Sequence, residues 1–457
     1  MTSIDPADLE VCLQVLARAQ ELDVEHPDAV AVRRATAGLF KTVKERRRAA
    51  RRAAILASDG AVTAATATAA PGRIDDETQG LPLAPPTAGR TAGTLVRARA
   101  CYVCKQRYRI VDAFYHQLCP DCAALNHGRR EARTDLEGRR ALLTGGRAKI
   151  GMYIALRLLR DGAHTTITTR FPRDAVERFT ALPDSREWLH RLRVVGIDLR
   201  DPAQAVRLAD TVAAEGPLDI LINNAAQTVR RSAQAYAPLT AAEAAPLPAG
   251  PLPELVTIGR PGATAPAVQA LLPGPAPAGE VLHEAGPDAA GLLPDLRAVN
   301  SWIQRVDEVD ALELLEVQLC NTTAPFILIS RLRPALAAAA ARRTYIVNVS
   351  AMEGQFARGY KGPGHPHTNM AKAALNMLTR TSAQELLSDG ILMTSVDTGW
   401  ITDERPHPTK MRLAEEGFHA PLDLVDGAAR VYDPIVRGEA GEDLHGCFLK
   451  DYRPAPW

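Results

Sequence analysis

The chain of 457 residues is poor in aromatic side chains and has almost no net charge. Phe, Trp and Tyr make up 5% of it, and the formal net charge is +1. A near-neutral chain has no whole-molecule attraction to nucleic acid or to a membrane surface. We find no apolar run near the roughly 20 residues that span a bilayer, and the acidic, polar opening MTSIDPADLE is unlike a signal peptide. We therefore expect a cytoplasmic protein whose partners include neither membrane nor nucleic acid.

Cysteine is also scarce, but four of the seven cysteines stand in two close pairs. Cys101 with Cys104 and Cys119 with Cys122 form two C-x2-C knuckles, separated by residues 105–118. In a cytosolic protein such spacing favours metal binding over disulfides, and four thiolates can surround one zinc ion tetrahedrally. A unit this small has too little core to fold without a metal. We predict one structural Zn²⁺, with a redox pair as the alternative.

Composition and periodicity divide the chain into four regions. Apolar residues at helical spacing predict a helical segment over 1–57, which ends near the basic run KERRRAARRA. A flexible linker is expected over 58–96, where Ala, Thr, Gly and Pro recur without periodicity. A zinc-knuckle-like unit follows over 97–130. From 136 to 457 strands and helices alternate, which predicts an α/β fold with a doubly wound parallel sheet of the Rossmann type.

Repeated Pro, Ala and Gly over residues 232–300 interrupt this alternation. The segment leaves the sheet between its fourth strand and the next helix. Ligands of doubly wound sheets bind outside the carboxyl ends of the strands, where this segment begins. A lid, a surface for a protein partner and a disordered tether are the open alternatives. The N-terminal region is the other candidate surface for a protein partner.

A glycine turn is the candidate nucleotide site. Residues 139–170 read RRALLTGGRAKIGMYIALRLLRDGAHTTITTR, a short strand followed by Gly145–Gly146, a helix from about Ile150 and a second strand. Backbone N–H groups and the helix dipole at such a turn bind anions such as a dinucleotide pyrophosphate. Gly145 permits the tight turn, and Gly151 lets the helix approach the phosphates. An ordinary βα turn is the alternative.

Six motifs between Leu136 and the C-terminus resemble, in order, those of the short-chain dehydrogenase/reductase family. They are Thr144-Gly145…Gly151, for its TGxxxGxG turn; Asp198 after the third strand; Asn223-Asn224-Ala225-Ala226, for its NNAG element; Asn321 in NTTAPF; Lys372 in HTNMAKAALNML; and Asp397-Thr398-Gly399-Trp400-Ile401-Thr402, for its PGxxxT region. The resemblance implies an oxidoreductase that acts on a carbonyl or alcohol group of a small molecule. It also implies pairing of subunits through the helix of Lys372, and hence a homo-oligomer.

The resemblance further implies which residues bind the cofactor. These are Thr144, Gly145, Arg147, Lys149, Ile150 and Gly151 in the turn, Arg170, Asp198 and Leu199 after the next strands, and Asn224, Ala225, Ala226, Lys372 and Thr402. Strand two ends in Arg170, where an NAD enzyme would carry Asp or Glu to bond the ribose hydroxyl. With Arg147 and Lys149 nearby, this favours NADP(H) over NAD(H), and solvent-facing cations are the alternative. Lys149 replaces the middle glycine of TGxxxGxG.

The catalytic positions depart from the family pattern. In the family a tyrosine donates a proton to the substrate, and a lysine four residues later lowers its pKa. Here Thr368 stands four residues before Lys372, and an aliphatic hydroxyl is far more basic than a phenol, whose pKa is about 10. His367 is our candidate replacement because histidine titrates near neutral pH. Ser350 lies one place before the position of the family serine.

Two classes of function remain open. The first is an NAD(P)H-dependent short-chain oxidoreductase with Thr368 in place of the family tyrosine. The second is a catalytically altered NADP-binding regulatory or scaffold protein. Retention of Lys372, of Thr402 and of Asn321, the family's anchor for a proton-relay water, favours the enzyme, which is our expectation.

Overall fold

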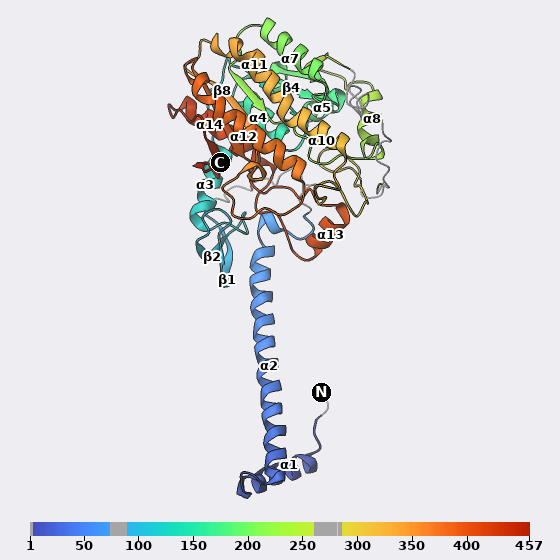
Figure 1. Cartoon of the computed structure of the whole chain (residues 1–457), viewed down its shortest axis with the longest axis vertical. Coiled ribbons are helices and arrows are strands. Elements are labelled where there is room, and N and C mark those ends of the chain that lie inside the picture. The colour runs from blue at the N-terminus through green and yellow to red at the C-terminus, as the bar shows by residue number, and fades with distance from the viewer. Residues whose placement is uncertain (1–2, 74–88, 260–280, 282–285) are drawn as a thin grey trace.

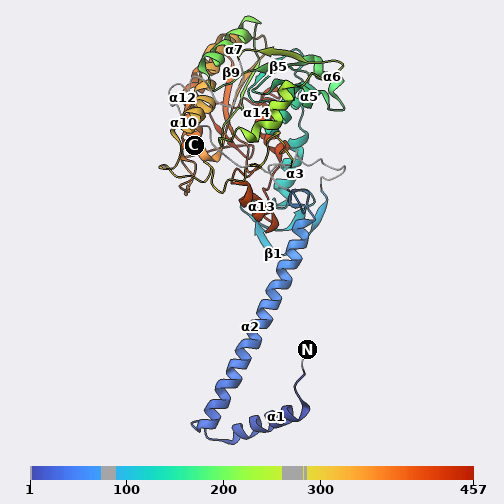
Figure 2. The same ribbon diagram turned by 90° about the vertical axis from the view of Figure 1, so that its right-hand side faces the viewer.

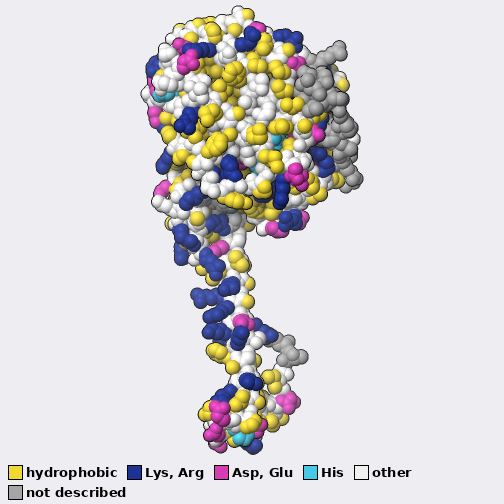
Figure 3. Space-filling view, in the orientation of Figure 1, with side chains coloured by type: hydrophobic (Ala, Val, Ile, Leu, Met, Phe, Trp, Pro, Cys, Tyr) yellow, Lys and Arg dark blue, Asp and Glu magenta, His cyan; other side chains and the backbone are white. Residues whose placement is uncertain are grey.

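A long helical stalk and a globular body make up the protein, as the computed structural model shows (Figure 1). The structure describes residues 3–73, 89–259, 281 and 286–457. Helix α1 (Pro6–Glu21) and helix α2 (Pro27–Ala64) each begin with proline, which suits the first turn of a helix. Figure 2 shows α2 projecting from the body with α1 at its far end, and Figure 3 shows Lys and Arg side chains along one side of this stalk.

The four-cysteine unit joins the stalk to the body. It contains the antiparallel strands β1 (Thr91–Ala100) and β2 (Arg107–Asp112), followed by helix α3 (Pro120–Glu131). The linker expected over 58–96 is shorter than predicted. Helix α2 continues to Ala64 because Val62 packs against the core of this unit, and β1 begins at Thr91. Residues 74–88 of the expected linker lie outside the described residues.

A nine-stranded sheet forms the centre of the body, in the order β11-β10-β9-β8-β6-β3-β4-β5-β7. All neighbouring strands run parallel except β10 and β11. The predicted doubly wound sheet is confirmed. The strands are β3 (Arg140–Leu143), β4 (His164–Thr169), β5 (Leu192–Gly196), β6 (Ile220–Asn223), β7 (Glu254–Thr257), β8 (Thr344–Ser350), β9 (Ile391–Asp397), β10 (Phe448–Lys450) and β11 (Arg453–Ala455).

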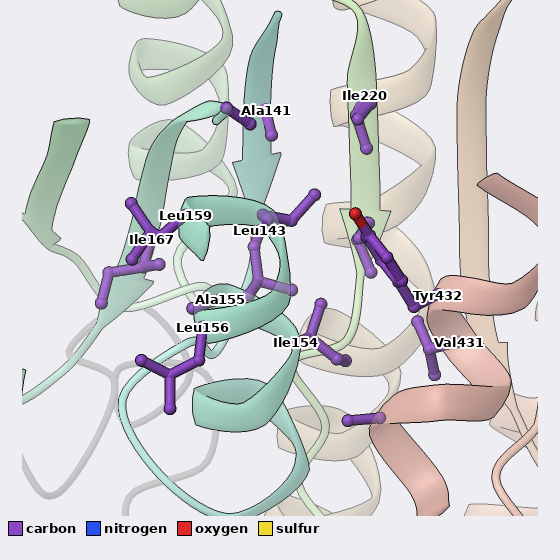
Figure 4. Close-up of a cluster of buried hydrophobic side chains, with 14 of the residues drawn as sticks. Ala141, Leu143, Ile154, Ala155, Leu156, Leu159, Ile167, Ile220, Val431 and Tyr432 are labelled. Atoms are coloured by element: carbon purple, nitrogen blue, oxygen red, sulfur yellow. The ribbon is translucent and has the colours of Figure 1, made fainter. Parts of the chain in front are cut away.

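Helices cover both faces of the sheet. On one face Ile154 of α4 and Val431 of α14 pack with Leu143, Ile167 and other strand residues (Figure 4). The second core joins α7, α11 and α12 to the opposite face. The helices are α4 (Lys149–Arg160), α5 (Pro172–Thr180), α6 (Ser185–Trp188), α7 (Pro202–Ala214), α8 (Ala237–Ala244), α10 (Ala311–Gln318), α11 (Ala324–Ala337), α12 (Pro366–Leu387), α13 (His407–Glu415) and α14 (Leu424–Glu439).

One helical stretch corrects the expectation about apolar runs. By length and composition, Ala311–Ala337 could cross a membrane. Half of its most apolar window is buried inside the protein, and Leu328 and Leu332 belong to the core beside α7. In this fold the stretch is a core helix, interrupted by the π-helical turn Leu319–Thr323.

The inserted segment over 232–300 contributes ordered structure. Its strand β7 extends the sheet by pairing in parallel with β5, and its helix α8 contacts α5. Residues 260–280 and 282–285 lie outside the described residues. The described parts of the insertion are therefore built onto the sheet edge, and they cover the side of the body where β4 and β5 end.

Candidate cofactor and active site

The glycine turn after β3 has the backbone shape that a phosphate-binding turn needs. Gly145 has a left-handed φ of 68°, and a Cβ at Gly151 would lie 2.0 Å from the Gly145 carbonyl oxygen. Lys149 replaces a family glycine, yet its φ of 51° keeps the left-handed conformation that glycine adopts readily. The turn therefore retains its shape despite this substitution.

Hydrogen bonds from the end of β6 hold this turn in place. The Asn224 side chain donates to the Thr144 and Gly145 carbonyls, each at 3.0 Å. The Thr144 hydroxyl in turn accepts from the Asn224 and Ala225 N–H groups at 3.0 Å. The TG and NNA motifs, which stand about 80 residues apart in the sequence, thus form one connected loop pair. Ala226, the next residue of this loop, lines a cavity at the carboxyl edge of the sheet.

Two arginines near the end of β4 have different surroundings. Arg147 forms an ion pair with Asp174 at 2.5 Å, so its charge is already neutralised. Arg170 instead lies over the Tyr236 ring, 5.1 Å from its centroid, and donates to the Tyr236 hydroxyl at 3.2 Å. Arg170 forms no ion pair with any residue that the structure describes. Arg170 thus lines the cavity as a cation without a carboxylate partner among the described residues.

Asp198 is held by an arginine that our sequence reasoning did not identify. Arg200 contacts the Asp198 carboxylate at 2.7 Å and also pairs with Glu316 at 2.8 Å. Burial alone would raise the pKa of Asp198, but hydrogen bonds and charge from Arg200 outweigh it and lower that pKa. Asp198 and Leu199 line the same cavity as Arg170.

Lys372 and Ser350 stand together at the other end of this cavity. The Lys372 ammonium donates to the carbonyl of Val349, the residue before Ser350, at 2.8 Å. Burial lowers the pKa of Lys372 to about 8. The Ser350 hydroxyl is buried and has no hydrogen-bond partner among the described residues. Both residues line the cavity, and the hydroxyl oxygen of Ser350 is itself buried.

Thr368 and His367, which we expected at the substrate, lie outside the lining of the cavity. Both are buried at the start of α12, with 3.5 Å between the Thr368 hydroxyl and His367 Nε2. Neither is among the residues that line the cavity, whereas Asn369 is. Burial lowers the pKa of His367 to about 4, so its ring is neutral at physiological pH. His367 therefore has no imidazolium proton to donate to a substrate at that pH.

Asn321 lies in the π-helical turn and supports the loop after β6. Its side-chain oxygen accepts from the Gln227 N–H at 2.7 Å, and its nitrogen donates to the Gln227 carbonyl at 2.9 Å. π-Turns inside helices are frequent at functional sites. Gln227, the residue that Asn321 holds, lines the cavity.

A single cavity of about 860 Å³ connects these groups at the carboxyl edge of the sheet. It runs from the glycine turn and Arg170 to Lys372, and the loop after β9 closes it with Trp400 and Thr402. Parallel sheets place ligand sites at this edge. Three further lining residues, Tyr102, Tyr236 and Trp302, were not identified from the sequence.

The four paired cysteines come together beside this site. The sulfurs of Cys101, Cys104, Cys119 and Cys122 all lie within 4.8 Å of one another. The Cys119 N–H donates to the Cys101 sulfur at 3.3 Å, a contact that stabilises a thiolate. Four sulfur donors at these distances suit the tetrahedral shell of a structural zinc ion. The predicted clustering is confirmed.

The fold and site define a Rossmann-type protein with a cavity beside its glycine turn, and comparison with known proteins gives its family. Residues 139–243 match the family model described as short chain dehydrogenase. An uncharacterized protein of Acanthamoeba polyphaga mimivirus (R665) is 32% identical over 359 residues, which cover 74% of this chain and 71% of that protein. The chain belongs to the short-chain dehydrogenase family of oxidoreductases, as its motifs predicted.

Two other similar proteins extend this comparison. A probable oxidoreductase of Streptomyces antibioticus is 38% identical over 94 residues, which are 20% of this chain and 30% of that protein. Among solved structures, an NADPH-bound carbonyl reductase from chicken fatty liver is 19% identical with a TM-score of 0.44. That match covers 70% of this chain and the whole of the other.

Proposed function

We propose that the protein is an NADP(H)-dependent oxidoreductase that interconverts a carbonyl group and an alcohol on a small molecule. The observation that carries this proposal is the continuous cavity from Arg170 to Lys372. Its volume of about 860 Å³ and its lining, which includes the glycine turn, Arg170 and Lys372, would suit a dinucleotide. The unpaired Arg170 would meet the 2′-phosphate of NADP, a group that NAD lacks.

NADPH, held by the glycine turn, Arg170 and Asp198, would supply the hydride for the carbonyl carbon of the substrate. The chain's own groups supply the proton. Lys372, with its pKa near 8, donates a proton to the carbonyl oxygen, and the Ser350 hydroxyl holds that oxygen by a hydrogen bond. The products are the alcohol and the oxidised cofactor. Thr368 and His367 are buried at the start of α12 and do not line the cavity.

We also propose that the four-cysteine cluster holds one structural zinc ion. The four sulfur ligands would fill a tetrahedral shell and leave no position open for substrate. The ion would stabilise the fold of this small unit and take no part in the reaction.

Titration of the purified chain with NADPH and NADH, followed by fluorescence or calorimetry, tests the proposed function. We expect NADPH to bind at least tenfold more tightly, because a charge-assisted contact contributes roughly 1.5–3 kcal/mol. Equal affinities, or a preference for NADH, would overturn the assignment of Arg170. A panel of aldehydes and ketones with NADPH then tests turnover, and binding without oxidation of NADPH would favour the regulatory alternative.

A further inference from the structure

The four-cysteine unit reaches into the wall of the cofactor cavity through one side chain. Tyr102, between the first two cysteines, lines the cavity together with Trp400. Its hydroxyl accepts a hydrogen bond from the Trp400 backbone N–H at 2.9 Å, across 298 positions of sequence. Trp400 belongs to the loop after β9, which carries Thr402. A side chain of the metal-binding knuckle therefore fastens a loop of the Rossmann domain.

The cysteine knuckle holds the backbone of Tyr102. The Tyr102 N–H donates to the Gln117 carbonyl at 2.8 Å, and the Lys105 N–H donates to the Cys101 carbonyl at 3.1 Å. Lys105 takes a left-handed φ of 63° to close this turn. The position of the Tyr102 hydroxyl is thus set by the folding of the knuckle around its four sulfurs.

Apolar packing joins the same two regions. Ile401, the residue after Trp400, is 2% exposed and belongs to one core with Cys101, Cys119 and Cys122. Ile150, at the start of the helix after the glycine turn, packs against this core as well. One cluster therefore touches both the start of the helix after the glycine turn and the loop after β9, and the Ile150 and Ile401 side chains both lie against Gly427.

Polar contacts fix the unit against the body. The Tyr115 hydroxyl donates to Asp426 at 2.6 Å, and Arg130 pairs with the same carboxylate at 3.0 Å. Asn126 accepts from Arg430 at 2.9 Å. These groups are buried, where the low dielectric strengthens each hydrogen bond and ion pair. The unit is not a loosely tethered appendage.

We propose that Tyr102 is a positioning residue for the cofactor, through which the four-cysteine unit holds residues 398–402 in their binding conformation. The inference rests on the proposed function, which places the nicotinamide half of NADPH at the Lys372 end of the cavity. It assigns the four-cysteine unit a role in ligand binding as well as in folding. Loss of the Tyr102 hydroxyl frees the Trp400 N–H and loosens this loop only.

The test compares Tyr102→Phe with Tyr108→Phe in the full chain. Tyr108 lies in the same unit, and its hydroxyl donates to the His116 carbonyl at 3.0 Å, within that unit. Calorimetry with two ligands separates the ends of the cavity, because 2′,5′-ADP carries only the adenosine half of NADPH. One net hydrogen bond contributes about 1 kcal/mol. We expect Tyr102→Phe to weaken NADPH about fivefold and to leave 2′,5′-ADP within twofold, with zinc content unchanged.

The other outcomes are equally informative. Tyr108→Phe should leave both affinities within twofold of the native chain. Unchanged NADPH affinity in Tyr102→Phe, or an equal loss for both ligands, would overturn the role of Tyr102 while leaving the proposed function standing. A native chain that binds neither NADPH nor 2′,5′-ADP would overturn both.

Discussion

Asp198 and Arg200 form a buried ion pair at the adenosine end of the cavity, with 2.7 Å between Oδ2 and Nη2. Glu316, on α10, completes the group as a second partner of the same guanidinium. The three residues are 2%, 3% and 1% exposed respectively. Arg200 thus bridges two carboxylates from different elements and couples the loop after β5 to α10, and Arg230 lies 3.6 Å from Glu316 as a second cation.

Replacement of Arg200 by methionine should destabilise the protein strongly. Removal of one partner from a buried ion pair leaves uncompensated charge and costs about 3–5 kcal/mol. Urea unfolding of Arg200→Met measures the loss. The control is Arg331→Met, because the exposed pair of Arg331 with Asp210 should contribute no more than about 1 kcal/mol. Similar losses in both variants would contradict this account.

Replacement of Arg170 by alanine should remove the preference for NADPH. We expect NADPH to bind roughly 10–100-fold more weakly, because a contact with the phosphate is charge-assisted, while NADH affinity changes little. Arg186→Ala is the matched control, since Arg186 is exposed on α6 and does not line the cavity. A parallel loss of NADPH and NADH affinity would indicate a folding defect and contradict the role of Arg170.

The rate of carbonyl reduction should fall as pH rises through about 8. The pKa of Lys372 is lowered to about 8 by burial, so its ammonium is present below that pH and is lost above it. The pH profile of kcat/KM for reduction measures the break. Ser350→Ala should reduce the rate but leave the break in place, because a serine hydroxyl does not titrate in this range. A profile that stays flat to pH 9.5 would exclude Lys372 as the proton donor.

Replacement of Cys104 by serine should lower both zinc content and thermal stability. The native chain should contain one zinc ion, and loss of one thiolate weakens a four-sulfur site whose metal binding is coupled to folding. Elemental analysis and thermal unfolding measure the two effects. Cys12→Ser is the control, because Cys12 is exposed on α1. Metal-free native protein purified under reducing conditions would refute the zinc site.

Replacement of Gly151 by alanine should abolish tight NADPH binding. The added Cβ would lie 2.0 Å from the Gly145 carbonyl oxygen and 2.8 Å from Asn224 Nδ2, so the turn must open. The control is Gly60→Ala on α2, where a Cβ meets nothing within 4 Å and helix propensity improves by about 1 kcal/mol. NADPH affinity within threefold of native in Gly151→Ala would show that the turn does not bind phosphate.

Local sequence patterns were sufficient to predict much of the fold. The alternation of strands and helices from residue 136 onward was predicted correctly because a buried parallel strand is a short apolar run between turns. The stalk boundary was missed because Val62 continues the helix through a contact with the cysteine unit. Strand β7 was missed because its only strand partner in the described sheet, β5, lies about 60 residues earlier in the chain.

The sequence by itself determined the parallel sheet, the glycine turn, the two cysteine pairs and the family motifs, since each depends on residue types at short spacing. Only the tertiary structure decided which groups share the cavity. It placed Lys372 beside Ser350, left His367 and Thr368 behind them, and brought Tyr102 to Trp400. Spacing along a chain cannot specify such contacts, because they depend on how separate elements pack and on what burial does to a charge.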